Sequence, residues 1–273
     1  MTLGSLPAKL TVFEKTNYRF KNWRHAKSGT VVFPGCGFPS FFPKTLAALE
    51  DALRPIPDVS IAIDCCGLPL AGLKSPDAFA AELARVEGRL ARIGAQKLVP
   101  LCPNCASAFS GTFGRSNPQV NVYACLRDLS ERGLIECAQL TVPGAVFVPC
   151  PDRAKREWLG DLSYFFGPSV FVSHCSVCCG AAFELSQPEA SVAAAKRVLE
   201  SVARECADVG AGDPVVYVYC ASCAGKLERV RRMFSGEPAG SVRVIHVLSA
   251  LMGVEETPAI STTVLNRAKA AIR

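Results

Sequence analysis

The stretch AIDCCGLPL (residues 62–70) ends a short apolar run with two adjacent cysteines and a glycine, and CSVCCGAAF (residues 175–183) repeats this arrangement. Two neighbouring thiols are poor partners for each other in a disulfide, so we expect each pair to bind something else. Both cysteines of a pair can face one centre only if the chain turns sharply after its strand. We therefore expect Gly67 and Gly180 to take a positive φ, which glycine adopts without steric cost.

The chain has 273 residues, of which 14 are cysteines. Its first apolar residues are scattered among charges, unlike a signal peptide, and no apolar run approaches the roughly 20 residues of a membrane span. We expect a soluble cytoplasmic protein without a membrane span. In a reducing cytosol, clustered cysteines are more often metal ligands or redox centres than structural disulfides.

The formal charge of +6 is concentrated at the N-terminus. The first thirty residues contain one acidic residue, Glu14, and six basic ones: Lys9, Lys15, Arg19, Lys21, Arg24 and Lys27. Because the remainder is nearly neutral, a broad nucleic-acid surface is disfavoured. The aromatic residues Phe13, Tyr18, Phe20 and Trp23 lie among these charges. They suggest a segment that docks on a partner, with equal weight for one that is solvated or folds back on its own domain.

From about residue 30 short apolar runs alternate with longer amphipathic ones, which predicts an α/β fold with mostly parallel sheets. The expected strands are Val31–Phe33, Ser60–Ile63, Leu98–Val99, Val146–Val148, Val170–Val172 and Val215–Val218. One expected helix has Ser75 as N-cap and buries Phe79, Leu83, Val86, Leu90 and Ile93 before Gly94. A second begins near Pro188 and buries Val192, Ala195, Leu199, Val202 and Cys206.

The order of landmarks repeats, which indicates an internal duplication with a junction near Pro143. Cys36 corresponds to Cys150, Cys65 to Cys178, and Cys102 to Cys220. NVYACLRDL (121–129) matches RVIHVLSAL (243–251) in pattern. We expect a basic N-terminal extension over residues 1–30, a first domain over 31–143 and a second over 144–273.

Each half carries five cysteines that directly follow predicted strands: Cys36, Cys65, Cys66, Cys102 and Cys105, then Cys150, Cys178, Cys179, Cys220 and Cys223. Because parallel strands end at one edge of a sheet, we expect each set to converge on one pocket. At the two C-x-x-C turns, helix N–H groups should favour the thiolate form. Five thiolates exceed the four of zinc or an ordinary cubane. This favours an unusual iron–sulfur cluster, or a cubane with one spare cysteine.

The double pattern resembles the cysteine-rich CCG-domain family, best known from heterodisulfide reductases. The resemblance covers residues 31 to about 255. It implies two pseudo-symmetric Rossmann-like CCG domains, each holding a non-cubane [4Fe-4S] cluster on its five cysteines. It also implies an iron–sulfur oxidoreductase subunit that reduces a small disulfide or thiol substrate between the clusters. Electrons would come from a partner protein with cubane clusters, alongside a flavoprotein. The second copy reads VPCPDR, with Pro151 where the family often has histidine.

Several alternatives stay open. The chain could be an electron-transfer adaptor without its own substrate, or one copy could hold zinc. Cys175 is either an extra thiolate ligand or a passive neighbour, and His174 beside it is a weak catalytic candidate. Lys44 and Lys226 could temper cluster charge or be solvated. Cys125 and Cys206 are expected in the core, and Cys137 has no predicted role.

Overall fold

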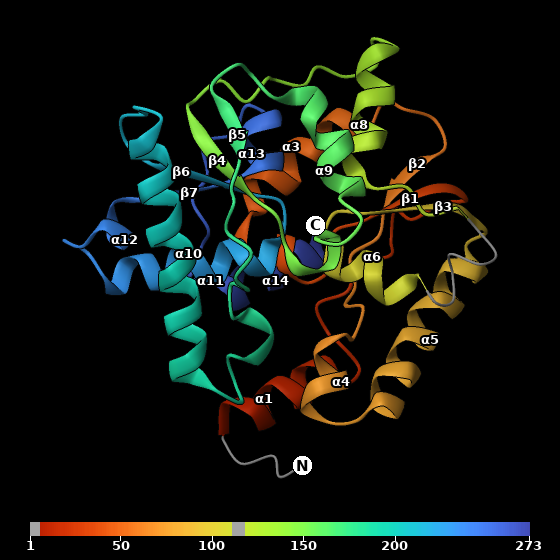
Figure 1. Ribbon diagram of the computed structural model, residues 1–273. Coiled ribbons are helices and arrows are strands. Elements are labelled where there is room, and N and C mark those ends of the chain that lie inside the picture. The colour runs from red at the N-terminus through yellow and green to blue at the C-terminus, as the bar shows by residue number, and fades with distance from the viewer. Residues whose placement is uncertain (1–5, 111–117) are drawn as a thin grey trace. The chain divides into compact units, whose positions relative to one another are not determined.

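The computed structural model describes residues 6–110 and 118–273. The chain forms two compact units (Figure 1). Unit 1 comprises the chain up to Cys125 together with Thr263–Arg273, and unit 2 comprises Leu126–Thr262. The sheets of both units are parallel, which confirms the predicted α/β class with parallel sheets.

Unit 1 is built on a three-stranded sheet in the order β2-β1-β3. Its elements are α1 (Leu6–Lys15), β1 (Gly29–Phe33), α2 (Gly37–Phe41), α3 (Pro43–Leu53), β2 (Val59–Ile61), α4 (Pro69–Leu73), α5 (Pro76–Arg92), β3 (Ala95–Pro100), α6 (Pro103–Phe109) and α14 (Thr263–Ile272). Outside β3, Gln119 makes an isolated parallel bridge to Leu98. The crossover helices between the strands keep this sheet parallel, as the alternating pattern predicts.

Helix α5 forms where the sequence predicts it and for the predicted reasons. The Ser75 side chain accepts a hydrogen bond from the Ala78 backbone N–H, which satisfies an otherwise unpaired donor of the first turn. Leu83, Val86 and Leu90 are buried. Phe79 and Ile93, at the two ends of the expected stripe, are only half-buried.

The basic N-terminal segment packs against the rest of unit 1, as the fold-back alternative predicts, and docking on a partner stays a prediction. Tyr18 is fully buried. The Asn22 backbone forms an antiparallel bridge with Ile63, just beyond the edge strand β2. The Trp23 indole N–H donates to the buried Asp64 carboxylate at 2.9 Å. Phe13, 74% exposed, is the member of the predicted aromatic set that remains at the surface.

Unit 2 contains a four-stranded sheet in the order β5-β4-β6-β7. The chain passes from unit 1 to unit 2 within α8 (Val122–Glu131). The elements that follow in unit 2 are β4 (Gly144–Phe147), η1 (Cys150–Asp152), α9 (Glu157–Leu162), η2 (Ser163–Phe165), β5 (Val170–Val172), η3 (Ala181–Phe183), α10 (Pro188–Asp208), β6 (Val215–Val218), α11 (Ala221–Met233), α12 (Pro238–Ser241), β7 (Arg243–His246) and α13 (Val247–Leu251). Strand β6 is buried along its whole length.

Helix α10 starts at Pro188 as predicted, and its apolar stripe faces the core. Leu199, Val202 and Cys206 are fully buried, whereas Val192 is half-buried because Ser191 takes the buried position beside it. Cys206 is thus a core residue, as predicted. Cys125 is half-buried rather than buried, which corrects its assignment to the core.

The two compact units divide the chain differently from the predicted domains. Residues before 31 pack into unit 1 instead of forming a separate extension. Helix α14 also belongs to unit 1, since it packs against α2 and its Asn266 amide donates to the Ser40 carbonyl. The matched stretches at 121–129 and 243–251 differ in structure: the first lies in a helix, and the second is a strand followed by a short helix. The second stretch begins as a strand because it pairs with β6 in the sheet of unit 2.

No helix within residues 6–110 and 118–273 combines the length and the apolar character that crossing a membrane requires.

Candidate functional site: two sets of contacting cysteines

The structure brings all five cysteines of the first set together within unit 1. The Sγ atoms of Cys36 and Cys65 lie 3.6 Å apart. The Cys105 thiol contacts those of both Cys102 and Cys66, and Cys66 lies close enough to Cys65 for their charges to interact. Four of the five residues are buried, and Cys36 is half-buried. As predicted, they follow β1, β2 and β3.

Two glycines allow the cysteine-bearing turns of unit 1 to approach one another. Gly67 has φ +74°, as predicted, and a Cβ there would lie 2.9 Å from the Glu82 side chain. Gly35 has φ +67°, and a Cβ there would lie 2.7 Å from the Cys105 sulfur. The sequence reasoning missed Gly35, although its position directly before Cys36 was the available signal.

The loop of Cys65 is held by a buried carboxylate. Asp64 is fully buried and accepts a hydrogen bond from the Cys65 backbone N–H at 2.8 Å. The Arg85 and Arg89 guanidinium groups, both on α5, pair with the same carboxylate. A buried charge is tolerated only when it is paired and hydrogen-bonded in this way. Asp64 therefore fixes the backbone that presents the cysteine pair.

Positive charge borders the first set from the two ends of the chain. Lys15, on α1, is buried, and its ammonium group lies 2.8 Å from the Glu14 carboxylate. Arg267, on α14, pairs with the same carboxylate at 2.7 Å. Although burial opposes it, the charges of Cys36 and Cys65 raise the pKa of Lys15 above its usual range. Lys15 and Arg267 are functional candidates that the sequence reasoning missed.

The second set is also brought together, within unit 2. The Sγ atoms of Cys179 and Cys223 lie 3.2 Å apart. The Cys178 thiol contacts those of Cys179 and Cys150, and the Cys223 thiol contacts that of Cys220. Cys150 is exposed and Cys178 half-buried, so this set is more open to solvent than the first. All ten patterned cysteines therefore contact a member of their own set.

The VPCPDR segment has a structural role in unit 2 through its aspartate. The buried Asp152 accepts backbone hydrogen bonds from Trp158 and Leu159, which caps the start of α9, and a third from the Tyr219 hydroxyl. Tyr219 directly precedes Cys220, so this contact ties the Cys150 loop to the loop of Cys220. Gly180 has φ +83°, as predicted.

A buried lysine accompanies the second set as well. Lys226, on α11, is 3% exposed and pairs with Glu184 at 3.1 Å, while Arg229 pairs with the same carboxylate at 2.5 Å. Lys226 acts on Cys179 through its charge. This position supports the predicted charge-tempering role of Lys226. Lys44 is exposed at the start of α3, and Lys15 takes the corresponding place at the first set.

The thiols of each set share protons unequally. A hydrogen bond from Cys65, helped by the charge of Lys15, lowers the pKa of Cys36 to about 6 against the opposing effect of burial. Hydrogen bonds with Cys178 and Cys223 lower the pKa of Cys179 well below its usual value. Each set thus favours one thiolate.

The C-x-x-C cysteines behave differently from the prediction. Hydrogen bonds with neighbouring thiols, and then burial, raise the pKa values of Cys105 and Cys223 well above the usual range. Both residues lie in the first turn of a helix, α6 and α11 respectively. For these two residues the direction is opposite to the expectation that helix N–H groups favour the thiolate form, because contacts with neighbouring thiols and burial raise the pKa.

The remaining candidates precede the cysteine pair of the second set in the chain. His174 is exposed, and its backbone N–H donates to Glu205 at 3.3 Å. Cys175 is half-buried, and its backbone N–H donates to the Ser173 hydroxyl. The catalytic role of His174 and the ligand role of Cys175 stay predictions. Burial raises the pKa of Cys137 to about 11, which makes that thiol a poor nucleophile.

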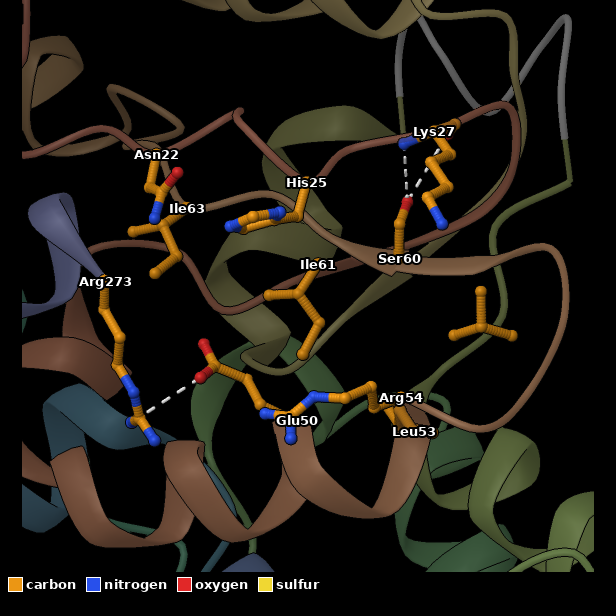
Figure 2. A pocket seen from close by; sticks show the side chains of 11 residues that line it. Asn22, His25, Lys27, Glu50, Leu53, Arg54, Ser60, Ile61, Ile63 and Arg273 are labelled. Atoms are coloured by element: carbon orange, nitrogen blue, oxygen red, sulfur yellow. Dashed lines mark hydrogen bonds and ion pairs between the residues drawn. The ribbon is translucent and has the colours of Figure 1, made fainter.

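Unit 1 also contains a pocket of about 330 Å³ that none of the ten cysteines lines. Figure 2 shows Glu50 of α3 and Arg54, which directly follows α3, on one side and His25 and Lys27 of the N-terminal segment on the other. The Glu50 carboxylate forms an ion pair with Arg273 at 3.5 Å. Burial raises the pKa of Glu50. This pocket is separate in its lining from the cysteine sets, which remain the candidate functional site.

No protein-family model and no curated protein matches the sequence. Three similar solved structures are racemases. Glutamate racemase isoform RacE1 from Bacillus anthracis is 14% identical, with 84% of this chain and 80% of that chain covered and a TM-score of 0.39. Aspartate racemase from Picrophilus torridus is 11% identical, with 89% and 100% covered and a TM-score of 0.39. Allantoin racemase from Klebsiella pneumoniae is 15% identical, with 83% and 85% covered and a TM-score of 0.30.

These findings contradict the predicted function, an iron–sulfur oxidoreductase subunit that reduces a disulfide. The three solved structures named above are racemases, not iron–sulfur reductases. In addition, no three or more His, Cys, Asp or Glu side chains of the described residues are arranged to hold a metal ion as they lie. The reductase prediction and its electron-transfer alternative are therefore withdrawn. The racemase names describe those proteins, and at these TM-scores nothing of their activity is assigned to this chain.

Proposed function

We propose that this protein binds one thiolate-ligated cofactor at each of its two cysteine sets. The ligands would be the ten patterned cysteines, five in each unit. For the cofactor we retain the prediction of a [4Fe-4S] cluster in each set, of non-cubane form, with zinc in one copy as the alternative. When bound, such a centre supplies the chemistry of thiolate-ligated iron or zinc. No reaction is proposed for it.

The observation that carries the proposal is a buried positive charge at each set. Lys15, Glu14 and Arg267 form one group, and Lys226, Glu184 and Arg229 form the other. Each group has two cations and one carboxylate, so each leaves one net positive charge. Lys15 and Lys226 are also the buried lysines of the described chain. A lysine is rarely buried unless an anion offsets its desolvation, and a thiolate-ligated centre in each set would supply that anion.

An unsatisfied hydroxyl points to the same conclusion at the first set. The Tyr18 hydroxyl is buried and has no hydrogen-bond partner within the described residues. Burial, and then the charge of Cys36, raises the pKa of Tyr18, which places this hydroxyl within electrostatic reach of the set. Leaving a buried hydroxyl unpaired costs about 1–3 kcal/mol. An anionic sulfur-rich centre beside it would accept its hydrogen bond.

The chemistry of the donor set fits a soft metal centre, although the thiols as they lie contact one another in pairs. The 3.2 and 3.6 Å sulfur separations are slightly shorter than the roughly 3.8 Å between two thiolates on one tetrahedral zinc, from a Zn–S bond of about 2.3 Å. A change of χ1 rotamer moves a cysteine sulfur by about 3 Å. A rotamer change is therefore comparable in size with the rearrangement that would turn paired thiols into metal ligands.

The arrangement of strands supports a duplicated origin for the two sites. Unit 1 orders its strands β2-β1-β3 and unit 2 orders them β5-β4-β6, so the first strand of each unit lies between the second and the third. In unit 2, β7 pairs with the outer edge of β6, and in unit 1 the bridge of Gln119 to Leu98 occupies the equivalent place beside β3. Two pseudo-symmetric Rossmann-like domains of the CCG family are the proposal that this order and the repeated cysteines support.

The predicted setting of the protein also remains a proposal. It comprises a cytoplasmic location and partner subunits, one with cubane clusters and one a flavoprotein. A small thiol or disulfide ligand is part of the same expectation. Co-purification from cells with the full-length protein as bait tests these partners directly. A protein that carries a cubane cluster or a flavin would be recognised by its visible absorption.

The two-site proposal is tested with one cysteine variant in each set. Cys66→Ala should remove the metal bound by the first set and leave that of the second, and Cys179→Ala should do the reverse. Cys206→Ala is the matched control, because this buried cysteine belongs to the apolar stripe of α10. The measurement is metal content per chain after purification without oxygen. Equal metal content in all three variants and the parent protein would overturn the proposal.

A further inference from the structure

Four of the six residues that line a second concave site in unit 1 carry a positive charge. Its lining residues are Lys21, Trp23, Arg24, Arg89, Arg92 and Ile93, around a volume of about 440 Å³. Two segments build it, the N-terminal segment that precedes β1 and the last turn of α5. No acidic residue is among the lining residues.

Three of the four cations are left without an acidic partner. Arg89 pairs with Asp64, but no ion pair to Lys21, Arg24 or Arg92 occurs within the described residues. Arg24 donates one hydrogen bond to the Ile272 carbonyl, which does not neutralise it. Arg89 and Arg92 gain some stabilisation from the C-terminal end of α5. That effect does not explain Lys21 and Arg24, which approach the same pocket from another segment.

The neighbouring positive charges affect the pKa of Lys21. Partial burial, and then the charges of Arg89 and Arg85, lower its pKa. Like charges are brought together at a cost, and a bound anion removes that cost.

Trp23 and Ile93 give the pocket an apolar part. The Trp23 indole is fixed on one side by its hydrogen bond to Asp64, and the Arg89 guanidinium lies 5.9 Å from its ring centre. Ile93 adds aliphatic surface. Cations next to an apolar surface suit a small molecule with a compact, multiply charged group.

We propose that this pocket binds a phosphate-bearing small molecule. Three unpaired cations match the charge of a diphosphate, whereas a single carboxylate would leave two of them unpaired. Arginine is well suited to this role, since its planar donors fit phosphate oxygens. The pocket is distinct from the cysteine sets. It is joined to the first one by Asp64, which binds both the Trp23 indole and the Cys65 backbone.

Trp23 provides a direct measurement of binding. The chain has two tryptophans, and Trp158, the other one, is buried in unit 2. Inorganic pyrophosphate titrated into the purified full-length protein should change the tryptophan fluorescence with a saturable profile, at ionic strength held constant with KCl. Trp23→Phe should remove the change. A change that KCl alone reproduces, or no saturable change, overturns the proposal.

The double variant Lys21→Ala with Arg92→Ala should weaken pyrophosphate binding at least tenfold. The matched control, Lys74→Ala with Lys97→Ala, removes the same charge from exposed positions of the same unit and should leave the affinity within about twofold. Equal affinity in both double variants would assign the effect to general charge and overturn the site. The far-ultraviolet circular dichroism of all variants should match the parent, which keeps loss of binding separate from loss of fold.

Discussion

At the scale of single residues, the glycine after each cysteine pair decides whether the two thiols can face one centre. Gly180 has φ +83°, and a Cβ at this position would lie 2.5 Å from the Ser191 carbonyl oxygen. The Ser191 hydroxyl in turn donates to the Gly180 carbonyl at 2.9 Å. The turn is therefore closed against the backbone of α10, which cannot move aside as a flexible side chain can.

We predict that Gly180→Ala destabilises the protein by more than about 2 kcal/mol. About 1 kcal/mol comes from the left-handed backbone and the rest from the contact with Ser191. Gly210→Ala is the control: Gly210 has φ +66° with nothing near its Cβ position, so it should lose only about 1 kcal/mol. Urea denaturation measures both. Equal losses would show that the turn after Cys179 has room for a side chain.

We also predict that the buried lysines Lys15 and Lys226 strengthen metal binding at their cysteine sets. Lys15→Met should weaken metal binding at the first set at least tenfold, which is about 1.4 kcal/mol, because it removes a buried positive charge beside the thiolates. Glu14 keeps Arg267 as its partner in this variant. Lys226→Met should have the same effect on the second set only, with Glu184 still paired to Arg229.

Competition with a chelator measures these affinities. Lys9→Met is the matched control, because Lys9 is exposed on the same helix as Lys15 and should leave both sites unchanged. If Lys15→Met and Lys9→Met release metal at equal chelator concentrations, the buried lysine has no part in holding the cofactor.

At the scale of secondary structure, local patterns were good predictors wherever the cause was local. The cap at Ser75, the start of α10 at Pro188 and the positive φ of Gly67 all follow from residues within one turn of the position. Lys15, Arg267 and Tyr18 could not be found in this way. They reach the first cysteine set only because α1, the segment that directly follows it and α14, which are far apart in the sequence, pack into the same unit.

We predict that Ser75→Ala lowers the free energy of unfolding by about 1 kcal/mol. The substitution removes the side-chain acceptor of the Ala78 backbone N–H and leaves that donor unpaired within the first turn of α5. Ser261→Ala is the control, since Ser261 is exposed and outside any helix. Denaturation midpoints that agree for the two variants would show that α5 does not depend on its cap.

At the scale of the whole molecule, two units that share the order of their first three strands each gather five cysteines at the carboxyl edge of a parallel sheet. The sequence repeat predicted that gathering, because parallel strands end at one edge. It did not predict the division of the chain, since helix α14 returns to unit 1 after unit 2 is complete. Nor did it predict the reaction: the reductase assignment came from resemblance, and resemblance does not establish chemistry.

The central claim is that both cysteine sets hold a metal centre through sulfur. X-ray absorption spectroscopy of the full-length protein, purified without oxygen, measures it directly together with metal content. We predict bound iron or zinc whose first coordination shell is dominated by sulfur, in amounts that account for two sites per chain. A metal-free protein that takes up neither metal on reconstitution, or a first shell of oxygen and nitrogen, would contradict the account.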